Sequence, residues 1–207
     1  IQDYDTIAAR IRSLPGVISV IPLVDGQVMA QSAQSAGGAL VRGMRESDLK
    51  ALTTISDNIT LGSLDGLDEG GVAVGARLAR SLGLTVGDNI RLLSPRGAIT
   101  PFGTAPKVGA FPIRAIFEIG MSEYDSSFVF MPLDEARNFF RTYEGVTALE
   151  IRVENPDAVN EMVKPVATAA GPCCDVVTWQ QTNESFFSAL QVERNVMFLI
   201  LTLILIV

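Results

Sequence analysis

Apolar side chains recur near the start of the chain at the spacing of one helix face. They stand three or four positions apart, with charged residues between them: Tyr4, Ile7, Ile11 and Leu14. This period predicts an amphipathic helix that ends at Pro15-Gly16. The almost unbroken apolar run over 17–24 then predicts a buried strand, with Pro22 at an edge or a bulge.

Turn-forming residues divide the segment that follows. Asp25-Gly26 is typical of a tight turn, so we expect residues 27–30 to pair back on 17–24 as a hairpin. The small polar residues over 31–38 indicate a loop. Residues 39–44 are expected to form a short strand, and 46–52 a helical turn.

The far end of the chain repeats this helix and strand pattern. Apolar and charged residues alternate over 149–154, which predicts a half-buried strand. Asn155 followed by Pro156 is a helix start signal, and the apolar positions of 159–166 predict a helix that ends at Gly171. Residues 174–178 are expected to form a strand. The two ends therefore look like two halves of one split βαβ layer.

The middle of the chain has shorter elements. Strands are predicted over 72–74, 90–93, 111–119 and 127–131, and helices over 76–82 and 133–143. Residues 94–110 contain three prolines and show little periodicity. We expect this block, about 53–145, to be an inserted and mostly β subdomain. The resulting fold class is α+β with two subdomains.

The C-terminal end is strongly apolar. A helical pattern over 180–194 leads into the last twelve residues (VMFLILTLILIV), which have no charge and one polar side chain, Thr202. A spanning helix needs about 20 apolar residues. We interpret this shorter run as the first half of a transmembrane helix that begins at Val196. A buried C-terminal helix or strand is the alternative.

Composition excludes several classes of function. The net charge of −7 argues against binding to nucleic acid or broadly to anionic lipid. The chain has no histidine, which excludes Ser-His-Asp and Cys-His catalysis and any His-ligated metal. The adjacent cysteines, Cys173 and Cys174, are interpreted as small buried apolar residues. We expect no enzyme activity, no metal and no cofactor.

Three segments deserve separate consideration as sites. The acidic loop with Asp65, Asp68 and Glu69 lacks the ligand spacing of a calcium loop, so we expect a solvated loop. The glycines of 71–75 lack the lysine of a phosphate-binding loop. Residues 99–106 place Phe102 between prolines, and a proline-stiffened loop with an exposed aromatic side chain is a plausible recognition element. The alternative is that Phe102 folds back onto the subdomain.

Three stretches of the chain form a recognisable set: GVAVG at 71–75 with LARSLGLTVGD at 78–88, TPFG at 100–103 with the strand that follows, and Trp179 with FF at 186–187 and LQVERN at 190–195. In these stretches the chain resembles the periplasmic domain of the lipoprotein-releasing ABC transporter permeases, the LolC/LolE type within the MacB/FtsX-like permease group. Together the three stretches span nearly the whole chain.

The resemblance implies an architecture and a set of boundaries. A split βαβ layer, Porter-like, consists of 1–52 and 146–195, the second half including a stalk helix. A mostly-β, Sabre-like subdomain occupies 53–145, and 196–207 starts a transmembrane helix. The domain would lie in the periplasm at the bacterial inner membrane.

The resemblance also implies a function. Such a permease extracts lipoproteins from the inner membrane and passes them to a soluble carrier, LolA, together with a second LolC/LolE-like permease and LolD-like ATPase subunits. A hook hairpin holds the carrier, and by position it falls within 94–107. The implied carrier-binding residues are Thr100, Pro101, Phe102, Gly103, Pro106 and Lys107.

Alternatives remain open at this stage. The basic patch that supports the carrier in LolC-like members is reduced here to Lys107, with Arg114 farther on. The chain could therefore be a LolC-like subunit, a LolE-like subunit or a hybrid. A MacB-like efflux permease would have no protruding loop over 94–107. An FtsX-like regulator of a cell-wall hydrolase usually has a smaller domain.

Overall fold

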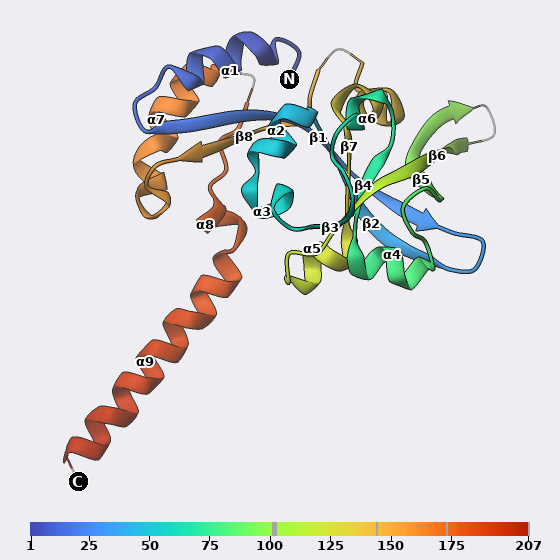
Figure 1. Cartoon of the computed structure of the whole chain (residues 1–207). Coiled ribbons are helices and arrows are strands. Elements are labelled where there is room, and N and C mark those ends of the chain that lie inside the picture. The colour runs from blue at the N-terminus through green and yellow to red at the C-terminus, as the bar shows by residue number, and fades with distance from the viewer. Residues whose placement is uncertain (101–102, 144, 173, 207) are drawn as a thin grey trace.

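The structure is a computed structural model that describes residues 1–206 apart from 101–102, 144 and 173. The side chains of 96–105, 184–191 and 205–206 are also outside the described set. Helices lie between the strands along the chain and most strand pairs are antiparallel, which confirms the predicted α+β class (Figure 1).

Six of the strands form a closed cycle. Hydrogen bonds join them in the order β2-β7-β4-β6-β5-β1, and β1 also pairs with β2. The β2–β7 and β4–β6 pairs are parallel and the other pairs in the cycle are antiparallel. The strands are β1 (Val17–Gln31), β2 (Ala36–Met44), β3 (Ile59–Gly62), β4 (Val72–Gly75), β5 (Asn89–Thr100), β6 (Gly103–Phe117), β7 (Phe128–Pro132) and β8 (Ala148–Val153). Closure leaves the paired strands of the cycle without open edges.

The helices pack against the closed cycle and against β3 and β8, the strands that extend from it. They are α1 (Tyr4–Arg12), α2 (Glu46–Ala51), α3 (Thr53–Ser56), α4 (Ala76–Leu82), α5 (Ser122–Ser127), α6 (Leu133–Phe140), α7 (Val159–Ala170), α8 (Trp179–Thr182) and α9 (Glu184–Ile206), with short 3-10 turns at Leu67–Glu69 and Pro156–Ala158. The predicted helices over 76–82, 133–143 and 159–166 are confirmed, the second ending at Phe140.

The alternation of side chains along β4 shows how the core is divided. Val72 and Val74 belong to one buried cluster, which includes apolar residues of α4 and α6. Ala73, between them, faces a second cluster with Phe117 and Phe130 under α2 and α3. Successive strand residues point to opposite faces, so a short buried strand can serve two cores.

The predicted turn at Asp25-Gly26 is wrong. Both residues lie inside β1, which continues to Gln31, and the hairpin turn to β2 falls at 32–35. Gly26 has a packing role instead, because a Cβ atom there would lie 2.3 Å from the ring of Phe140. The glycine allows α6 to approach the strand closely. The predicted loop over 31–38 is correspondingly shorter, since β2 begins at Ala36.

Strand β1 belongs both to the closed cycle and to the sheet extension that contains β8. Its first half pairs with β8, and its second half pairs with β2 and β5. Figure 1 shows β1 crossing the domain from the side of α1 and α7 to the side of β5 and β6. Arg42 on β2 adds a polar link, with Nε 3.2 Å from Asp25 Oδ1 and Nη1 3.1 Å from Glu150 Oε2. Burial raises the pKa of Asp25, although Arg42 acts in the opposite direction.

A third core cluster lies outside the cycle. Ile7 and Ile11 of α1 and Val166 of α7 pack on the first half of β1, with half-buried Cys174 against them. The N-terminal helix, β1, β8 and α7 thus form the layer that the sequence predicts from the two ends of the chain. Cys173, the other half of the predicted buried pair, lies outside the described residues. The prediction of a strand at 174–178 is wrong, since these residues have neither helical nor strand structure.

The stalk leaves the domain after a short interruption at Asn183. Helix α9 extends away from the other elements in Figure 1, and its apolar side chains from Val196 to Ile204 are mostly exposed. Within the described residues, no helix has both the length and the apolar character that a membrane crossing requires. The start of a transmembrane helix at Val196 remains a prediction, as do the subdomain boundaries.

Candidate functional site

The β5–β6 hairpin is the longest paired element of the fold. Its ladder runs from Asn89↔Pro112 to Ser94↔Lys107, and after an irregularity it continues from Ala98↔Ala105 to Thr100↔Gly103. Figure 1 shows the end of this hairpin projecting beyond the neighbouring strands. Of the predicted site residues, Thr100 and Gly103 are therefore placed by backbone pairing at the hairpin end. Pro101 and Phe102 lie outside the described residues.

Prolines explain the irregularity in the ladder. Between its two regular parts, residues 95–97 of β5 stand opposite the single residue Pro106 of β6. Pro95 and Pro106 have no N–H group to donate, so proline in a sheet is confined to edges and bulges. A bulge bends the strand that carries it and increases its twist. The sequence thus separates the hairpin end from the regular sheet, and Pro106 is exposed at this junction.

An apolar row follows on the outer face of the sheet. Met29, Leu93 and Val108 are direct neighbours across β1, β5 and β6. Met29 is 45% exposed and Val108 57% exposed. This row was not predicted from the sequence, because the adjacent residues Leu92 and Leu93 are both apolar and only the structure shows that Leu92 is buried and Leu93 half-exposed. Single exposed apolar residues are common, but three adjacent ones beside a projecting hairpin extend the surface available to a partner.

Lys107 of β6 connects the hairpin to helix α6. Its ammonium group donates a hydrogen bond to the backbone carbonyl of Asn138 at 2.6 Å and stands 5.8 Å from the ring centre of Phe139. Arg114 is directed elsewhere, because its Nε donates to Gly70 O at 2.9 Å. Arg91 is exposed beside the apolar row, and within the described part of the chain no carboxylate pairs with it.

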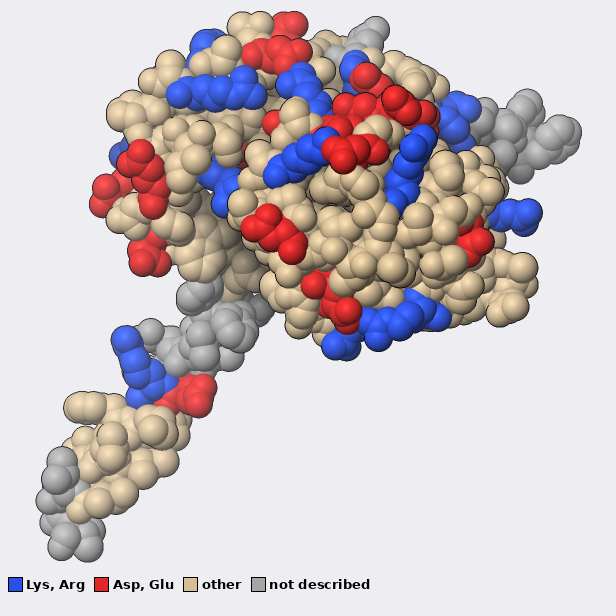
Figure 2. All heavy atoms as spheres, in the orientation of Figure 1, with Lys and Arg blue, Asp and Glu red and all other residues tan. Residues whose placement is uncertain are grey.

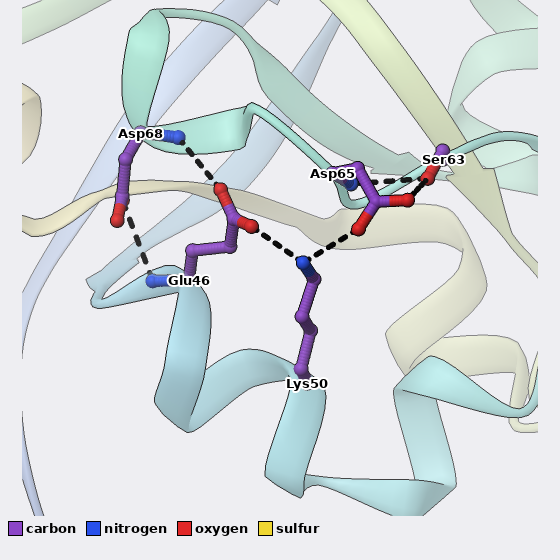
Figure 3. Close-up of polar contacts among 5 residues, drawn as sticks. All are labelled: Glu46, Lys50, Ser63, Asp65 and Asp68. Carbon is purple, nitrogen blue, oxygen red and sulfur yellow. Dashed lines mark hydrogen bonds and ion pairs between the residues drawn. The ribbon is translucent and has the colours of Figure 1, made fainter.

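The charged loop near Asp65 has a structural role. Lys50 of α2 binds the carboxylates of both Glu46 and Asp65, the latter at 2.6 Å, as Figure 3 shows. Glu46 also accepts a hydrogen bond from the backbone N–H of Asp68 at 3.2 Å, and Ser63 Oγ donates to Asp65 at 2.8 Å. Within the described residues, no group of three His, Cys, Asp or Glu side chains could hold a metal ion.

The Lys50 contacts predict a pH dependence of stability. The hydrogen bond from Lys50 lowers the pKa of both Glu46 and Asp65 below their ordinary values of 4.5 and 3.8. A carboxylate with a lowered pKa stabilises the folded state above its unfolded pKa, and the contribution is lost as the pH falls through the folded pKa. We expect Lys50→Met to lower the melting temperature at pH 7, and we expect this difference to shrink progressively as the pH falls below about 4.

Thermal unfolding of both proteins between pH 3 and pH 8 measures this difference. A difference in melting temperature that stays constant down to pH 3 would show that Lys50 acts through its aliphatic chain instead. The pKa of Lys50 itself is raised, first by Asp65 and then by Glu46. Its share of the stabilisation is therefore complete below its unfolded pKa and is lost only as the pH rises through the higher folded value.

The fold and the hairpin define a class of protein. Residues 1–169 match the MacB-like periplasmic core domain family, and the chain belongs to this family. It is 27% identical over 206 residues to the lipoprotein-releasing system transmembrane protein LolC of Neisseria meningitidis serogroup B, covering 98% of this chain and 50% of that protein. The identity to LolC of Xylella fastidiosa (strain 9a5c) is 25%, covering 99% of this chain and 49% of that protein.

Solved structures share the fold at low sequence identity. The extracellular domain of the noncanonical ABC-type transporter YknZ from Gram-positive bacteria superposes with a TM-score of 0.55 at 13% identity, covering 81% of each chain. The periplasmic region of MacB from Actinobacillus actinomycetemcomitans has a TM-score of 0.52 at 10% identity, covering 81% of this chain and 74% of that one. The chain spans about half the length of the curated relatives it matches. The resemblance drawn from the sequence is thereby confirmed.

Proposed function

We propose that this chain is the periplasmic domain of an ABC transporter permease that takes lipoproteins from the inner membrane and passes them to a soluble periplasmic carrier. The β5–β6 hairpin is the carrier-binding hook in this proposal. A second LolC/LolE-like permease and separate LolD-like ATPase subunits complete the transporter. The permease itself is not an enzyme in this account, and the described side chains offer no nucleophile with an adjacent base in a pocket.

The main support for this proposal is the projecting β5–β6 hairpin. Its ladder continues to Thr100↔Gly103, so only the two residues Pro101 and Phe102 connect the strands. The end of such a paired element is a place that a partner protein can reach. The relatives named lipoprotein-releasing system transmembrane protein LolC support the assignment to a lipoprotein-releasing permease. A MacB-like efflux permease remains the alternative, but that reading predicts no protrusion over 94–107.

This chain differs from the LolC-like members in the basic patch beside the hook, which is reduced here to Lys107 and Arg114. Lys107 already bonds to the carbonyl of Asn138, and Arg114 is used at Gly70. Contacts beside the hook would then be mainly apolar, through Met29 and Val108, with Arg91 at the border. We therefore assign the carrier contact chiefly to Thr100, Pro101, Phe102, Gly103 and Pro106, with Lys107 orienting the hairpin on α6 through one of its donors.

A shortened hairpin tests the function. Ala98 and Ala105 are directly paired, so replacing residues 99–104 with Asn-Gly should close the hairpin in a two-residue turn and leave the sheet intact. In proteoliposomes with the complete transporter, we expect this variant to keep ATP hydrolysis and to lose lipoprotein release to the carrier. Release at the rate of the unmodified transporter would contradict the proposal and favour the efflux alternative.

A further inference from the structure

Helix α8 lies between the domain and the stalk (Figure 1). It is one turn long and directly follows Thr178, whose side chain is buried. Thr178 Oγ1 accepts a hydrogen bond from Gln181 N at 3.3 Å, and Gln181 Oε1 accepts one from Thr178 N at 3.0 Å. This reciprocal pair is a capping box, which satisfies the first donors of a helix and so defines where the helix starts. The start of α8 is therefore held at the surface of the domain.

Two further hydrogen bonds attach α8 to the segment that follows β8. Trp179 Nε1 donates to Pro156 O at 3.0 Å, and Asn160 Nδ2 donates to Gln180 Oε1 at 2.7 Å. Pro156 belongs to the 3-10 turn after β8, and Asn160 lies in the first turn of α7. We call these two hydrogen bonds the clamp. They connect the root of the stalk to the one segment that joins β8 to α7.

The stalk is a long lever on this clamp. Asn183 interrupts the helix, and α9 then begins at Glu184. At about 1.5 Å per residue, Arg194 lies about 15 Å beyond Glu184. No charged residue follows Arg194 in the sequence, and Figure 2 shows an uncharged stalk surface beyond the charged side chains. In the proposed permease this uncharged end lies in the membrane, so motion that starts there reaches the domain at α8.

The clamped segment is continuous with the main sheet. Glu154 N donates to Gly16 O at 2.9 Å, next to the start of β1. Strand β8 pairs with the first half of β1, and Met29 in the second half of β1 is paired with Leu93 of β5. Strand β5 leads to the hook. Packed elements and hydrogen-bond networks carry coupling between distant sites, so these paired strands link the clamp to the hook.

We propose that α8 is the joint through which the stalk moves the domain, and that Trp179 and Gln180 are positioning residues that hold the stalk to the segment after β8. This inference rests on the proposed function, because lipoprotein release is the step that the motion serves. Displacement of α9 passes through the clamp to β8 and α7 instead of being absorbed at Asn183. Without the clamp, ATP hydrolysis continues but the domain no longer follows the stalk.

The amount of lipoprotein released per ATP tests this role. Trp179→Phe keeps an aromatic ring and removes the donor to Pro156 O, and Asn160→Ala removes the donor to Gln180. In proteoliposomes with the complete transporter and the carrier, we expect the double variant to hydrolyse ATP at the rate of its parent. We expect it to release about fivefold less lipoprotein per ATP, or a still smaller amount.

Two further variants separate coupling from a general loss of stability. Ser122→Ala removes an exposed hydrogen bond from Arg77 between α4 and α5, away from the stalk, and should leave release per ATP unchanged. Asn160→Asp, in place of Asn160→Ala, offers a carboxylate that can accept from the amide N–H of Gln180. We expect this substitution to recover part of the lost release.

A distance measurement tests the clamp without any substrate. With Cys173 and Cys174 changed to serine, spin labels are attached at Val192→Cys on the stalk and at Lys164→Cys on α7, both exposed positions. In the complete transporter we expect one narrow distance distribution, whose mean stays constant when nucleotide binds. In the double variant we expect a broader distribution, whose mean shifts with nucleotide because the stalk then moves without α7.

The two measurements fail in different ways. Parental release per ATP in the double variant, or an equal loss in the Ser122→Ala variant, would overturn the proposal. An unchanged distance distribution in the double variant would also overturn it. If the unmodified transporter releases no lipoprotein, the proposed function is wrong, and the distance distributions alone still decide whether α8 anchors the stalk.

Discussion

Replacing Phe102 with alanine is expected to weaken binding of the carrier by about 30-fold or more. Phe102 lies in the two-residue connection between Thr100 and Gly103, at the end of the hairpin that projects from the domain. Aromatic anchors at the centre of an interface typically contribute about 2–4 kcal/mol when truncated. Isothermal titration of the soluble carrier with the domain measures the change in dissociation constant.

Val108→Ala is the matched control for this substitution. Val108 is exposed on β6 next to the bulge, so its truncation removes apolar surface near the hook without altering the hairpin end. We expect a loss of affinity below about threefold, as for residues at the rim of an interface. Equal effects of the two substitutions would place the carrier on the sheet face rather than on the hairpin end. No effect of Phe102→Ala would remove the assignment of the hook.

Substitution of Asp125 by alanine is expected to cost about 3–5 kcal/mol of unfolding free energy, for two lost hydrogen bonds to its carboxylate. Asp125 is fully buried on α5, and its two carboxylate oxygens accept hydrogen bonds from Ile119 N at 2.9 Å and Gly120 N at 3.1 Å. Alanine removes the acceptor of both backbone N–H groups, and each hydrogen bond to a charged group contributes about 1.5–3 kcal/mol. Urea denaturation followed by circular dichroism measures the loss.

Asp125→Asn provides the control for this prediction. The amide keeps one carbonyl oxygen as an acceptor and nearly the same volume, so the expected loss is smaller than that of Asp125→Ala. The backbone of Asp125 also lies close to Gly75, where a Cβ atom would stand 2.4 Å from Asp125 O. A loss below about 1 kcal/mol for Asp125→Ala would show that water replaces the carboxylate and that this corner of the fold is not desolvated.

Local patterns predicted most of the helices and strands correctly, because each carries its own signal. The caps and apolar faces of α4 and α7 are examples. Long-range pairing was not predictable. The closed cycle depends on β1 meeting both β2 and β5, and no local feature of β1 encodes two partners. Gly26 shows the same limit: Asp25-Gly26 has the composition of a turn, but contact with Phe140 across the core decides its conformation.

The site was predictable to a similar extent. Prolines and the aromatic residue over 99–106 indicate a recognition loop, and the resemblance places a hook there. The pairing of β5 with β6 up to Thr100↔Gly103 could not be read from the sequence, because residues 94–110 lack the alternation of a regular strand. The role of Lys107 was also hidden. Its hydrogen bond to Asn138 depends on how α6 packs beside the hairpin.

Site-specific photocrosslinking locates the carrier-binding surface of the domain. A benzoylphenylalanine probe replaces Phe102 in one protein and the exposed residue Lys164 of α7 in a second, and each is irradiated with purified carrier. We predict a cross-linked complex with the probe at Phe102 and none with the probe at Lys164. No cross-link at Phe102 in a folded domain, or equal cross-linking at both positions, would contradict the assignment of the β5–β6 hairpin as the carrier-binding hook.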